Sequence, residues 1–324
     1  MVAGVAVVLA VAMLAALMLG SSSVGAADVV AWLRGSPTDA ARNILENVRL
    51  PRVLGAVLAG AALAQAGALI QATLNNPLAG PNIIGVNAGS GLFVLLAACV
   101  APHVMGVSAV AAFLGALATA LLVFAISAVA DSSRLAVVLA GMALTAVFTA
   151  GMNAVLIFNP DAYVDASGFL VGSLSGVLTQ ELVVPGAVIA LALPLAALQG
   201  DRLNVLSLGD ASAHALGLNV PRTRLALLAL AALLAGAAVC FAGLIGFVGL
   251  VVPHVVRFLA GSNNRRVLVL SPLVGALLVC VCDTLARTAF APFEVPVGIV
   301  LALIGGPFFV YLILRGQKGG AYEQ

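Results

Sequence analysis

The stretch LAGAALAQAG, residues 58–67, consists almost entirely of small and apolar residues, and it returns as LAGAAVCFAG at residues 234–243. Seven of the ten positions are unchanged, and at the same offset Pro77 corresponds to Pro253. The repetition therefore predicts two related helices in an apolar environment, with chance similarity between alanine- and glycine-rich segments as the alternative.

The composition of the whole chain points the same way. Its 324 residues are 63% hydrophobic and 8% charged, whereas an ordinary soluble domain is about one quarter charged. Apolar runs of roughly 20 residues cross a bilayer as helices. We predict an all-α integral membrane protein, a single transmembrane domain over residues 1–324 with about ten transmembrane helices and no nucleic-acid partner. The apolar stretches are residues 2–22, 52–74, 84–101, 107–130, 134–157, 182–199, 222–242, 244–260, 267–290 and 296–314.

Two features of the apolar stretches have simple interpretations. Residues 2–20 could form a cleaved signal peptide, but the lack of a Lys/Arg-rich start favours a retained first helix. The cysteines lie inside or at the edges of apolar stretches, which is typical of small core residues and not of a metal site or a disulfide. They are Cys99, Cys240, Cys280 and Cys282.

The distribution of basic residues predicts the orientation of the chain. With ten spans both termini share a side, and placing them in the cytoplasm gives the cytoplasmic loops nine basic residues against five outside. This bias favours cytoplasmic termini. The nine are Arg134, Arg202, Arg222, Arg224, Arg257, Arg265, Arg266, Arg315 and Lys318, and the five are Arg34, Arg42, Arg49, Arg52 and Arg287.

In this orientation the two copies of the repeated segment run in opposite directions. They predict an inverted internal repeat that relates helices 2–5 to helices 7–10. Such repeats recur in transport proteins, where the pathway forms at the interface between them.

A polar segment follows the first copy: LNNPLAGPNIIGVNAGSG, residues 74–91. Pro77 and Pro81 do not fit inside an ordinary helix. Irregular polar backbone at membrane depth is tolerated where it lines a cavity or is covered by protein, and a cytoplasmic loop is the alternative. Both interpretations agree if the loop closes the inner end of a pathway.

A second polar segment, VLSLGDASAHALGLNVPRTR (205–224), predicts a short amphipathic helix in the cytoplasm. Ser207 is suited to cap its start, Gly217 to end it, and Pro221 to begin the next helix. The apolar face of this helix is expected to contain Leu208, Ala211, Ala215 and Leu216.

No motif in the sequence indicates a catalytic site, a metal site or a nucleotide-binding site. There is no Walker A sequence, no metal-ligand cluster and no nucleophile–base arrangement. Charged residues within apolar stretches are few, and Asp283 and Arg287 have the spacing of a helical ion pair. The sequence thus predicts a transport pathway but no site that supplies energy for transport. The cytoplasmic helix is suited to receive mechanical work from another subunit.

Four segments together resemble the iron-chelate and cobalamin permease family of bacterial ABC (type II) importers, with the ferric citrate permease subunits as the nearest likeness. They are RLPRVLGAVLAGAALAQAGALIQATLNNPLAGPNIIGVNAGSG (49–91), LSLGDASAHALGLNV (206–220), GLIGFVGLVVPHVVRFLAG (243–261) and EVPVGIVLALIGGPFFVYLILR (294–315). The resemblance covers nearly the whole chain, in order and at the family's spacings.

The resemblance implies a permease with ten helices in the bacterial inner membrane and no cofactor bound by this chain. A second permease subunit, identical or paralogous, two cytoplasmic ATPases that bind ATP and Mg, and an extracytoplasmic binding protein would complete the importer. The segment 205–220 would contain the coupling helices. The residues that resemble the family's ATPase-coupling positions are Leu208, Gly209, Asp210, Ala213, His214, Leu216, Gly217 and Leu218.

The same resemblance implies two further sites. One is a cytoplasmic gate or pathway segment formed by Asn75, Asn76, Pro77, Leu78 and Asn82. The other is a docking site for acidic residues of the binding protein, formed by Arg49, Arg52 and Arg287. Docking would explain arginines on the outer side, although snorkelling toward the membrane interface is the alternative.

The expected function is import of an iron(III) chelate, either ferric citrate or a siderophore. Haem and cobalamin are alternative substrates within the same family. An ion-coupled secondary transporter is the alternative from another class, and the scarcity of acidic residues in the spans disfavours it.

Overall fold

The computed structural model describes residues 1–20, 24–82, 84–101, 104, 106–129, 133–289, 291 and 293–319, and the regular secondary structure in these ranges is helical. The all-α prediction is confirmed, and a helix occupies most of each of the ten apolar stretches. The helices are α1 (Val2–Met18), α2 (Ala26–Leu33), α3 (Asp39–Ile44), η1 (Leu45–Arg49), α4 (Leu50–Leu74), α5 (Val86–Val100), α6 (Val107–Val129), α7 (Arg134–Phe158), α8 (Asp161–Val171), α9 (Thr179–Ala197), α10 (Gly200–Ser207), α11 (Asp210–Ala215), α12 (Val220–Ala242), α13 (Val248–Ala260), α14 (Asn264–Thr288) and α15 (Val297–Gly319).

The lengths of these helices fit a multi-pass membrane protein. Within the described residues, six helical stretches are long and apolar enough to cross a membrane, and α1, α5, α13 and α15 supply four shorter apolar helices. The count of ten spans stays a prediction, because α1, α5, α13 and the apolar segment Val297–Leu312 of α15 are shorter than an ordinary span.

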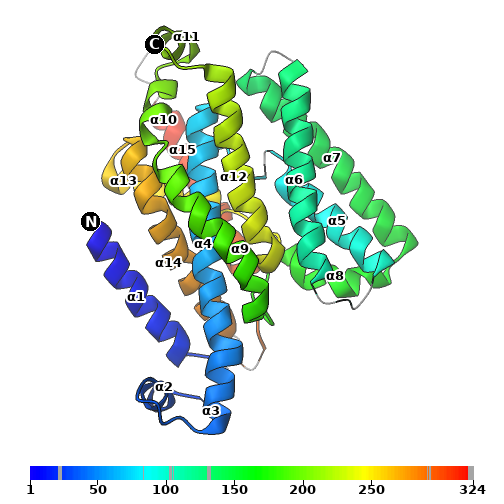
Figure 1. The fold of residues 1–324 in the computed structure, drawn as a ribbon, viewed down its shortest axis with the longest axis vertical. Coiled ribbons are helices and arrows are strands. Elements are labelled where there is room, and N and C mark those ends of the chain that lie inside the picture. The colour runs from blue at the N-terminus through cyan, green and yellow to red at the C-terminus, as the bar shows by residue number, and fades with distance from the viewer. Residues whose placement is uncertain are drawn as a thin grey trace.

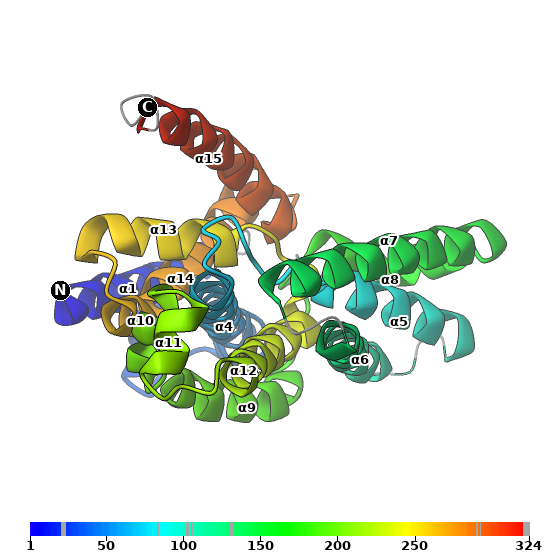
Figure 2. The ribbon, with the colours of Figure 1, turned by 90° about the horizontal axis from the view of Figure 1, so that it is seen from above.

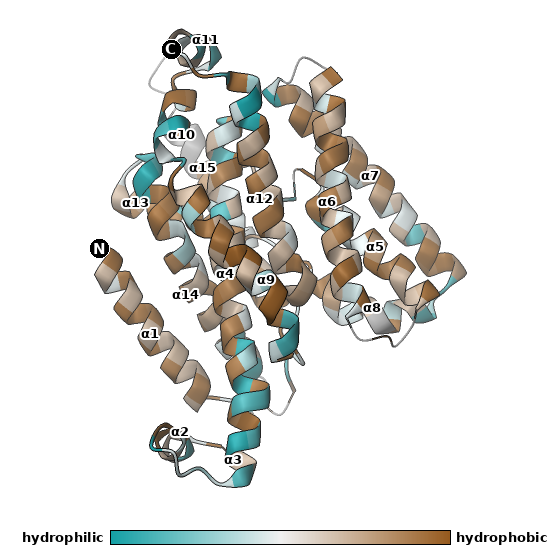
Figure 3. Ribbon diagram, viewed as in Figure 1, coloured by the Kyte–Doolittle hydropathy of each residue, from teal (hydrophilic) through white to brown (hydrophobic). Residues whose placement is uncertain are grey.

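The helices form an elongated bundle whose two ends differ from its middle (Figure 1). Helices α10 and α11 lie at one end, and α2 and α3 lie at the other. Figure 3 shows hydrophilic residues gathered toward these ends and hydrophobic residues between them. We call the two ends the α11 end and the α3 end. Viewed from above, α15 extends away from the central helices on one side, and α7 lies with α5 and α8 on another (Figure 2).

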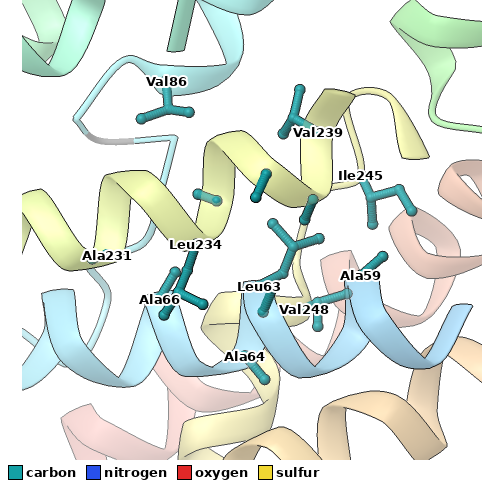
Figure 4. Packing of buried hydrophobic residues seen from close by; sticks show 14 of the residues in the cluster. Ala59, Leu63, Ala64, Ala66, Val86, Ala231, Leu234, Val239, Ile245 and Val248 are labelled. Carbon is teal, nitrogen blue, oxygen red and sulfur yellow. The ribbon is translucent and has the colours of Figure 1, made fainter. Parts of the chain in front are cut away.

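Helix α4 forms the centre of the bundle. It packs against α9, α12, α13 and α14 and is buried along most of its length. In Figure 4, Leu63 and Ala66 of α4 point toward α12, and Leu234 of α12 points back toward them. This helix therefore holds together elements that are distant in the sequence.

Two glycines let α4 approach its neighbours closely. A Cβ atom on Gly60 would overlap the carbonyl group of Gly275 in α14, and one on Gly67 would overlap Gly249 in α13. Lipid tails are as apolar as the helices, so helix association in a membrane depends strongly on close packing between small residues. The absence of a side chain at these glycines is thus a condition for the observed packing.

The two helices that contain the repeated segment, α4 and α12, pack together and run in opposite directions (Figure 1). Their local structures diverge from the last matched position onward. Gly67 lies inside α4, whereas Gly243 has a φ of +70° and follows the last residue of α12. Pro77 lies outside any helix, whereas Pro253 is inside α13. The sequence correspondence therefore does not extend to local structure at these positions, and the repeat of helices 2–5 and 7–10 stays a prediction.

The close contact at Gly60 leads to a stability prediction. Gly60→Ala is expected to lower the free energy of unfolding by about 1–3 kcal/mol, because the new methyl group must displace the α14 backbone. Gly4→Ala in α1 is the matched control, since a Cβ there meets open space and alanine favours a helix by up to about 1 kcal/mol. Denaturant unfolding of both variants in detergent measures the difference, and equal stabilities would contradict the packing account.

Candidate functional site

The polar segment at the α11 end forms two short helices, not one. Ser207 is the last residue of α10, and its hydroxyl donates a hydrogen bond to the Asn204 carbonyl oxygen at 2.6 Å. The prediction that Ser207 caps the start of the amphipathic helix is therefore wrong. Gly209, with a φ of +98°, precedes α11, and Asp210 is the first residue of that helix. The chain turns at Gly209 because glycine adopts this backbone conformation without steric cost.

The predicted end of the short helix is confirmed. Gly217 has a φ of +83°, and its N–H donates to the His214 carbonyl oxygen at 2.9 Å. The Leu218 N–H donates to the Ala213 carbonyl oxygen at 3.0 Å. These two bonds form the motif in which a left-handed residue ends a helix. Pro221 lies in the first turn of α12, as predicted.

The α10–α11 patch, residues 200–218, presents an apolar surface at the α11 end. Leu208 is 62% exposed and Leu216 is 65% exposed, and Ala211 and Ala215 are also exposed. Ala213 is the buried residue that anchors α11 to the rest of the chain. Within one chain, the predicted apolar face is thus open to a partner, and its coupling role stays a prediction.

Asp210 ties this patch to two spanning helices. Its Oδ1 accepts hydrogen bonds from Arg134 Nη2 at 2.8 Å and from Arg224 Nη2 at 2.9 Å, and its Oδ2 accepts from Arg224 at 2.8 Å. Arg134 is the first residue of α7, and the buried Arg224 belongs to α12. The hydrogen bond from Arg224 is the main cause that lowers the pKa of Asp210, and both guanidinium charges add to it. Because this pKa is lowered, the stabilisation is present at neutral pH and is lost as the pH falls through it.

Sequence reasoning missed this three-residue contact. Arg224 was counted as one of the basic residues of the cytoplasmic loops, and the structure buries it against Asp210. A polar residue in the first turn of a short helix indicates capping, but it does not reveal partners 14 and 76 positions away.

The predicted gate segment begins where α4 ends. Asn75 has a left-handed φ of +47°, and the Asn76 N–H donates to the Gln71 carbonyl oxygen at 3.0 Å. Asn76 Oδ1 then accepts a hydrogen bond from the Leu78 N–H at 2.9 Å. Pro77 and Asn82 are exposed, and Pro77 lies outside any helix as predicted. The segment is a turn held by its own asparagine, and its gating role stays a prediction.

A second irregular segment meets this turn. Residues 243–247 separate α12 from α13, and Phe247 has a φ of +65°, which is strained for a bulky residue. A cavity of about 110 Å³ lies between the two segments, lined by Leu78, Asn82 and Phe247 among others. The structure thus brings together the two places where the helices near the centre are interrupted.

Gln71 connects the same region. This buried residue donates from Nε2 to the Gly249 and Leu250 carbonyl oxygens at 3.2 and 3.3 Å. Its Oε1 accepts a hydrogen bond from Arg257 Nη1 on α13. Sequence reasoning did not select Gln71, although an isolated amide in an apolar helix is a signal for such a contact.

The three arginines of the predicted docking site are buried and have partners within the chain. Arg49 donates from Nη1 to the Leu17 carbonyl oxygen at 2.6 Å and from Nη2 to the Val24 carbonyl oxygen at 2.8 Å. Arg287 donates to the Ala16 carbonyl oxygen. The three side chains are therefore held inside the chain, and the alternative that they snorkel to the membrane interface is wrong for this structure. Their docking role stays a prediction.

Arg52 forms the centre of an ionic cluster at the α3 end. Its Nε donates to Asp283 at 3.0 and 3.1 Å, and its Nη1 donates to Glu294 Oε2 at 2.6 Å. The Arg287 Nε lies 3.8 Å from Asp283, which agrees with the predicted helical pair. Asp283 is nevertheless closer to Arg52 on another helix. Buried charges require such partners because their desolvation is costly.

Comparison with known proteins places these features in a family context. The profile of the FecCD transport family matches residues 8–315. The chain is 40% identical over 320 residues to the hemin transport system permease protein HmuU of Yersinia pestis, with 94% of each chain covered. It is 38% identical over 296 residues to the Fe(3+) dicitrate transport system permease protein FecC of Escherichia coli, covering 90% of this chain and 89% of the relative.

The fold is also similar to a solved structure. A chain described as part of a metal-chelate type ABC transporter in an inward-facing conformation superposes with a TM-score of 0.86 at 30% identity. The match covers 97% of this chain and 98% of that chain. The likeness therefore extends over the whole bundle, including both ends.

The contacts of Asp210 predict local mobility in a variant. Asp210→Asn removes the charge that pairs with Arg134 and Arg224, so we expect faster amide hydrogen exchange in α11. Asp201→Asn is the matched control, because Asp201 is exposed in the first turn of α10. Exchange mass spectrometry that gives the same α11 rates in both variants would contradict the role assigned to Asp210.

The cluster at the α3 end predicts a larger effect on stability. Asp283→Asn removes the negative charge that compensates the buried guanidinium groups of Arg52 and Arg287. Breaking a buried ion pair lowers the free energy of unfolding by about 3–5 kcal/mol. Asp161→Asn is the control, since Asp161 is exposed at the start of α8. Denaturant unfolding of the two variants in detergent should differ by that amount, and a neutral Asp283→Asn would refute the assigned contribution of the cluster.

Proposed function

Because the chain belongs to the FecCD transport family, we propose that it is the permease subunit of an ATP-binding cassette importer that brings an iron(III) chelate into the cytoplasm. The structural observation that carries the proposal is the α10–α11 patch. It presents Leu208 and Leu216 outward, and Asp210 connects it to α7 and α12. A surface of this kind is suited to receive force from a partner.

The proposed assembly supplies the ATPase activity for which the sequence has no motif, and a partner for the exposed α10–α11 patch. Its sequence has no nucleotide-binding motif, so ATP and Mg are assigned to two cytoplasmic ATPase subunits. A second permease subunit, identical or paralogous, and an extracytoplasmic binding protein complete the assembly. We place the chain in the bacterial inner membrane with ten spans and an inverted repeat. Basic residues at the α11 end, including Arg134, Arg202, Arg222, Arg265 and Arg266, support cytoplasmic termini.

The relatives support the class of substrate. They include permeases described for Fe(3+)-citrate and for siderophores, which supports ferric citrate or a siderophore here. Haem is the second candidate, because the permease described for hemin transport is 40% identical over 94% of the chain. All of these substrates are metal complexes, so the proposal at the level of a metal chelate does not depend on the choice between them.

Coupling would begin at the exposed leucines of the patch. When an ATPase changes shape against Leu208 and Leu216, the displacement passes through α11 to Asp210. The two guanidinium groups at Asp210 then transmit it to α7 and α12, because charge-assisted hydrogen bonds are short and directional. The proposed coupling residues His214, Gly217 and Leu218 lie within or directly after α11.

The proposed gate lies where the two interrupted helices meet. Asn75, Asn76, Pro77, Leu78 and Asn82 form one side, and the strained Phe247 lies on the other. Irregular backbone at membrane depth is tolerated where it lines a cavity, which supports a pathway role. The hydrogen bonds from Gln71 to α13 would keep the two sides aligned.

Docking of the binding protein is proposed at the α3 end. Of the three arginines, Arg52 has a partner that reaches the surface, since the Glu294 side chain is 33% exposed. A carboxylate of the binding protein could replace Glu294 at Arg52. In this structure Arg49 and Arg287 hold the surrounding backbone through the carbonyl oxygens of Leu17 and Ala16.

A substitution on the patch tests the proposed function. Leu216→Asp places a charge on the exposed apolar surface and should weaken ATPase association or coupled hydrolysis at least several-fold, because an unpaired charge resists burial at an interface. Val30→Asp makes the same chemical change on an exposed valine at the α3 end and should leave the ATPase attached. Co-purification of the ATPase and transport-coupled ATP hydrolysis are measured for both variants. Wild-type values of both for Leu216→Asp would show that the patch only connects neighbouring helices and does not bind the ATPase.

A second substitution tests docking at Arg52. Glu294→Gln removes the competing internal charge, so a binding protein that uses Arg52 should bind up to about fivefold more tightly, as expected for a partly exposed ion pair. Glu46→Gln is the control, because Glu46 is another acidic residue at the α3 end and accepts from Trp32 Nε1 at 2.9 Å. Surface plasmon resonance at low salt measures both variants. Unchanged or weaker binding of Glu294→Gln would reject the exchange of carboxylates.

A further inference from the structure

A crevice between α6, α9 and α12 has no role in the proposed pathway. Its apolar part has a volume of about 490 Å³. Phe113 and Leu114 of α6 and Val184 and Val188 of α9 form its walls, and Ala237 of α12 lies at its base. Volumes of this size are typical of small-molecule sites lined by apolar side chains.

A more polar cavity of about 570 Å³ continues from this crevice at the α3 end. Glu181 and Cys240 line both cavities, which makes them adjoining parts of one feature. Ser108, Ser173 and Ser175 are among the residues that line the polar part. Ser173 Oγ accepts from the Ser175 N–H at 3.1 Å, and the Ser175 hydroxyl donates to Glu294 Oε2 at 3.4 Å. The complete crevice is therefore amphipathic, with its apolar part deeper in the membrane.

The depth of the apolar part matches one leaflet of a bilayer. On α9 and the residue before it, the lining extends from Leu178 to Val188, which at a rise of 1.5 Å per residue is about 15 Å. Half of a typical hydrocarbon core is also about 15 Å. Both α6 and α9 are long enough to span the membrane, and most of each span is not buried by the rest of the chain. The crevice thus opens toward lipid within a single leaflet.

The charges around the crevice distinguish between lipid head groups. Glu181 lies at the junction of the two parts, and its Oε2 caps α9 by accepting from the Leu178 N–H at 3.1 Å. Neither cavity has a Lys or Arg among its described lining residues. A carboxylate without a neighbouring cation attracts an ammonium group and repels an additional negative charge. The hydroxyls of Ser108 and Ser173 can each donate one hydrogen bond to a phosphate oxygen, whereas the Ser175 hydroxyl donates to Glu294 in this structure.

We propose that this crevice binds a zwitterionic phospholipid with a primary ammonium group, of the phosphatidylethanolamine type, from the leaflet at the α3 end. One acyl chain fills the apolar part between α6 and α9. The ammonium group lies near Glu181, and the phosphate lies among the serine hydroxyls. This proposal requires only that the chain spans a membrane, so it is independent of the substrate and of the ATPase.

Photo-crosslinking tests the site directly. The full-length chain, with the subunits that co-purify with it, is placed in phosphatidylcholine nanodiscs that contain phosphatidylethanolamine with a diazirine in one acyl chain. Mass spectrometry should locate adducts on the lining residues of α6 and α9. Val188→Trp fills the apolar part and should remove most of these adducts. Val183→Trp, on the same helix at an exposed valine outside the crevice, should retain them.

A second variant tests the head group. Glu181→Gln keeps an oxygen that can cap α9 but removes the charge. It should lower labelling by the phosphatidylethanolamine probe by about two- to fivefold relative to a phosphatidylglycerol probe, as expected for one exposed charge pair. An unchanged ratio, equal labelling of Val188→Trp and Val183→Trp, or crosslinks from the crevice to another protein chain would each overturn the proposal.

Discussion

The contact of α4 with α13 and α14 is the constraint on which the rest of the structure depends. Arg52, Gly60, Gly67 and Gln71 contribute to it at successive positions along α4. The two glycines allow the backbones to approach closely in the middle of α4. Close packing matters there because the hydrophobic effect does not drive helices together in lipid. The two polar residues act nearer the ends of α4, where each satisfies partners on a neighbouring helix. Close packing and buried polar contacts therefore hold one central block from end to end.

The features assigned to function lie around this block. Of the two interrupted segments that form the proposed gate, one directly follows α4 and the other directly precedes α13. Helix α15 extends away from the block on one side, and α7 lies with α5 and α8 on another (Figure 2). Helix α7 is joined to the α10–α11 patch through Arg134 and Asp210. The centre is closely packed, and an ion pair joins the α11 end to α7, which is less packed. This arrangement is expected if force applied at the α11 end moves one part of the bundle against another.

Much of the fold could be predicted from the sequence because it depends on local properties. Hydropathy located the helices of the apolar stretches but not α2, α3 and α8, which lie outside those stretches. Gly217 and Pro221 marked a helix end and a helix start that the structure confirms. Ser207 was misassigned because its hydroxyl bonds back within α10 and Gly209 provides the turn.

The polar contacts could not be predicted in the same way. Arg52 and Asp283 are 231 positions apart, so no local pattern reveals that they meet. The charge count singled out Arg49, Arg52 and Arg287 because they break the positive-inside bias, but it did not reveal their partners within the chain. Their burial depends on packing between α1, α4 and α14, which the sequence does not display.

Uptake into proteoliposomes tests the central claim most directly. The chain is reconstituted with its partner subunits, and a labelled ferric chelate is supplied with the binding protein outside and ATP inside, without any ion gradient. The account predicts accumulation that stops when the ATPase is catalytically inactive and persists in the presence of an uncoupler. Accumulation that continues with the inactive ATPase, and that collapses with the uncoupler, would show an ion-coupled secondary transporter and contradict the account.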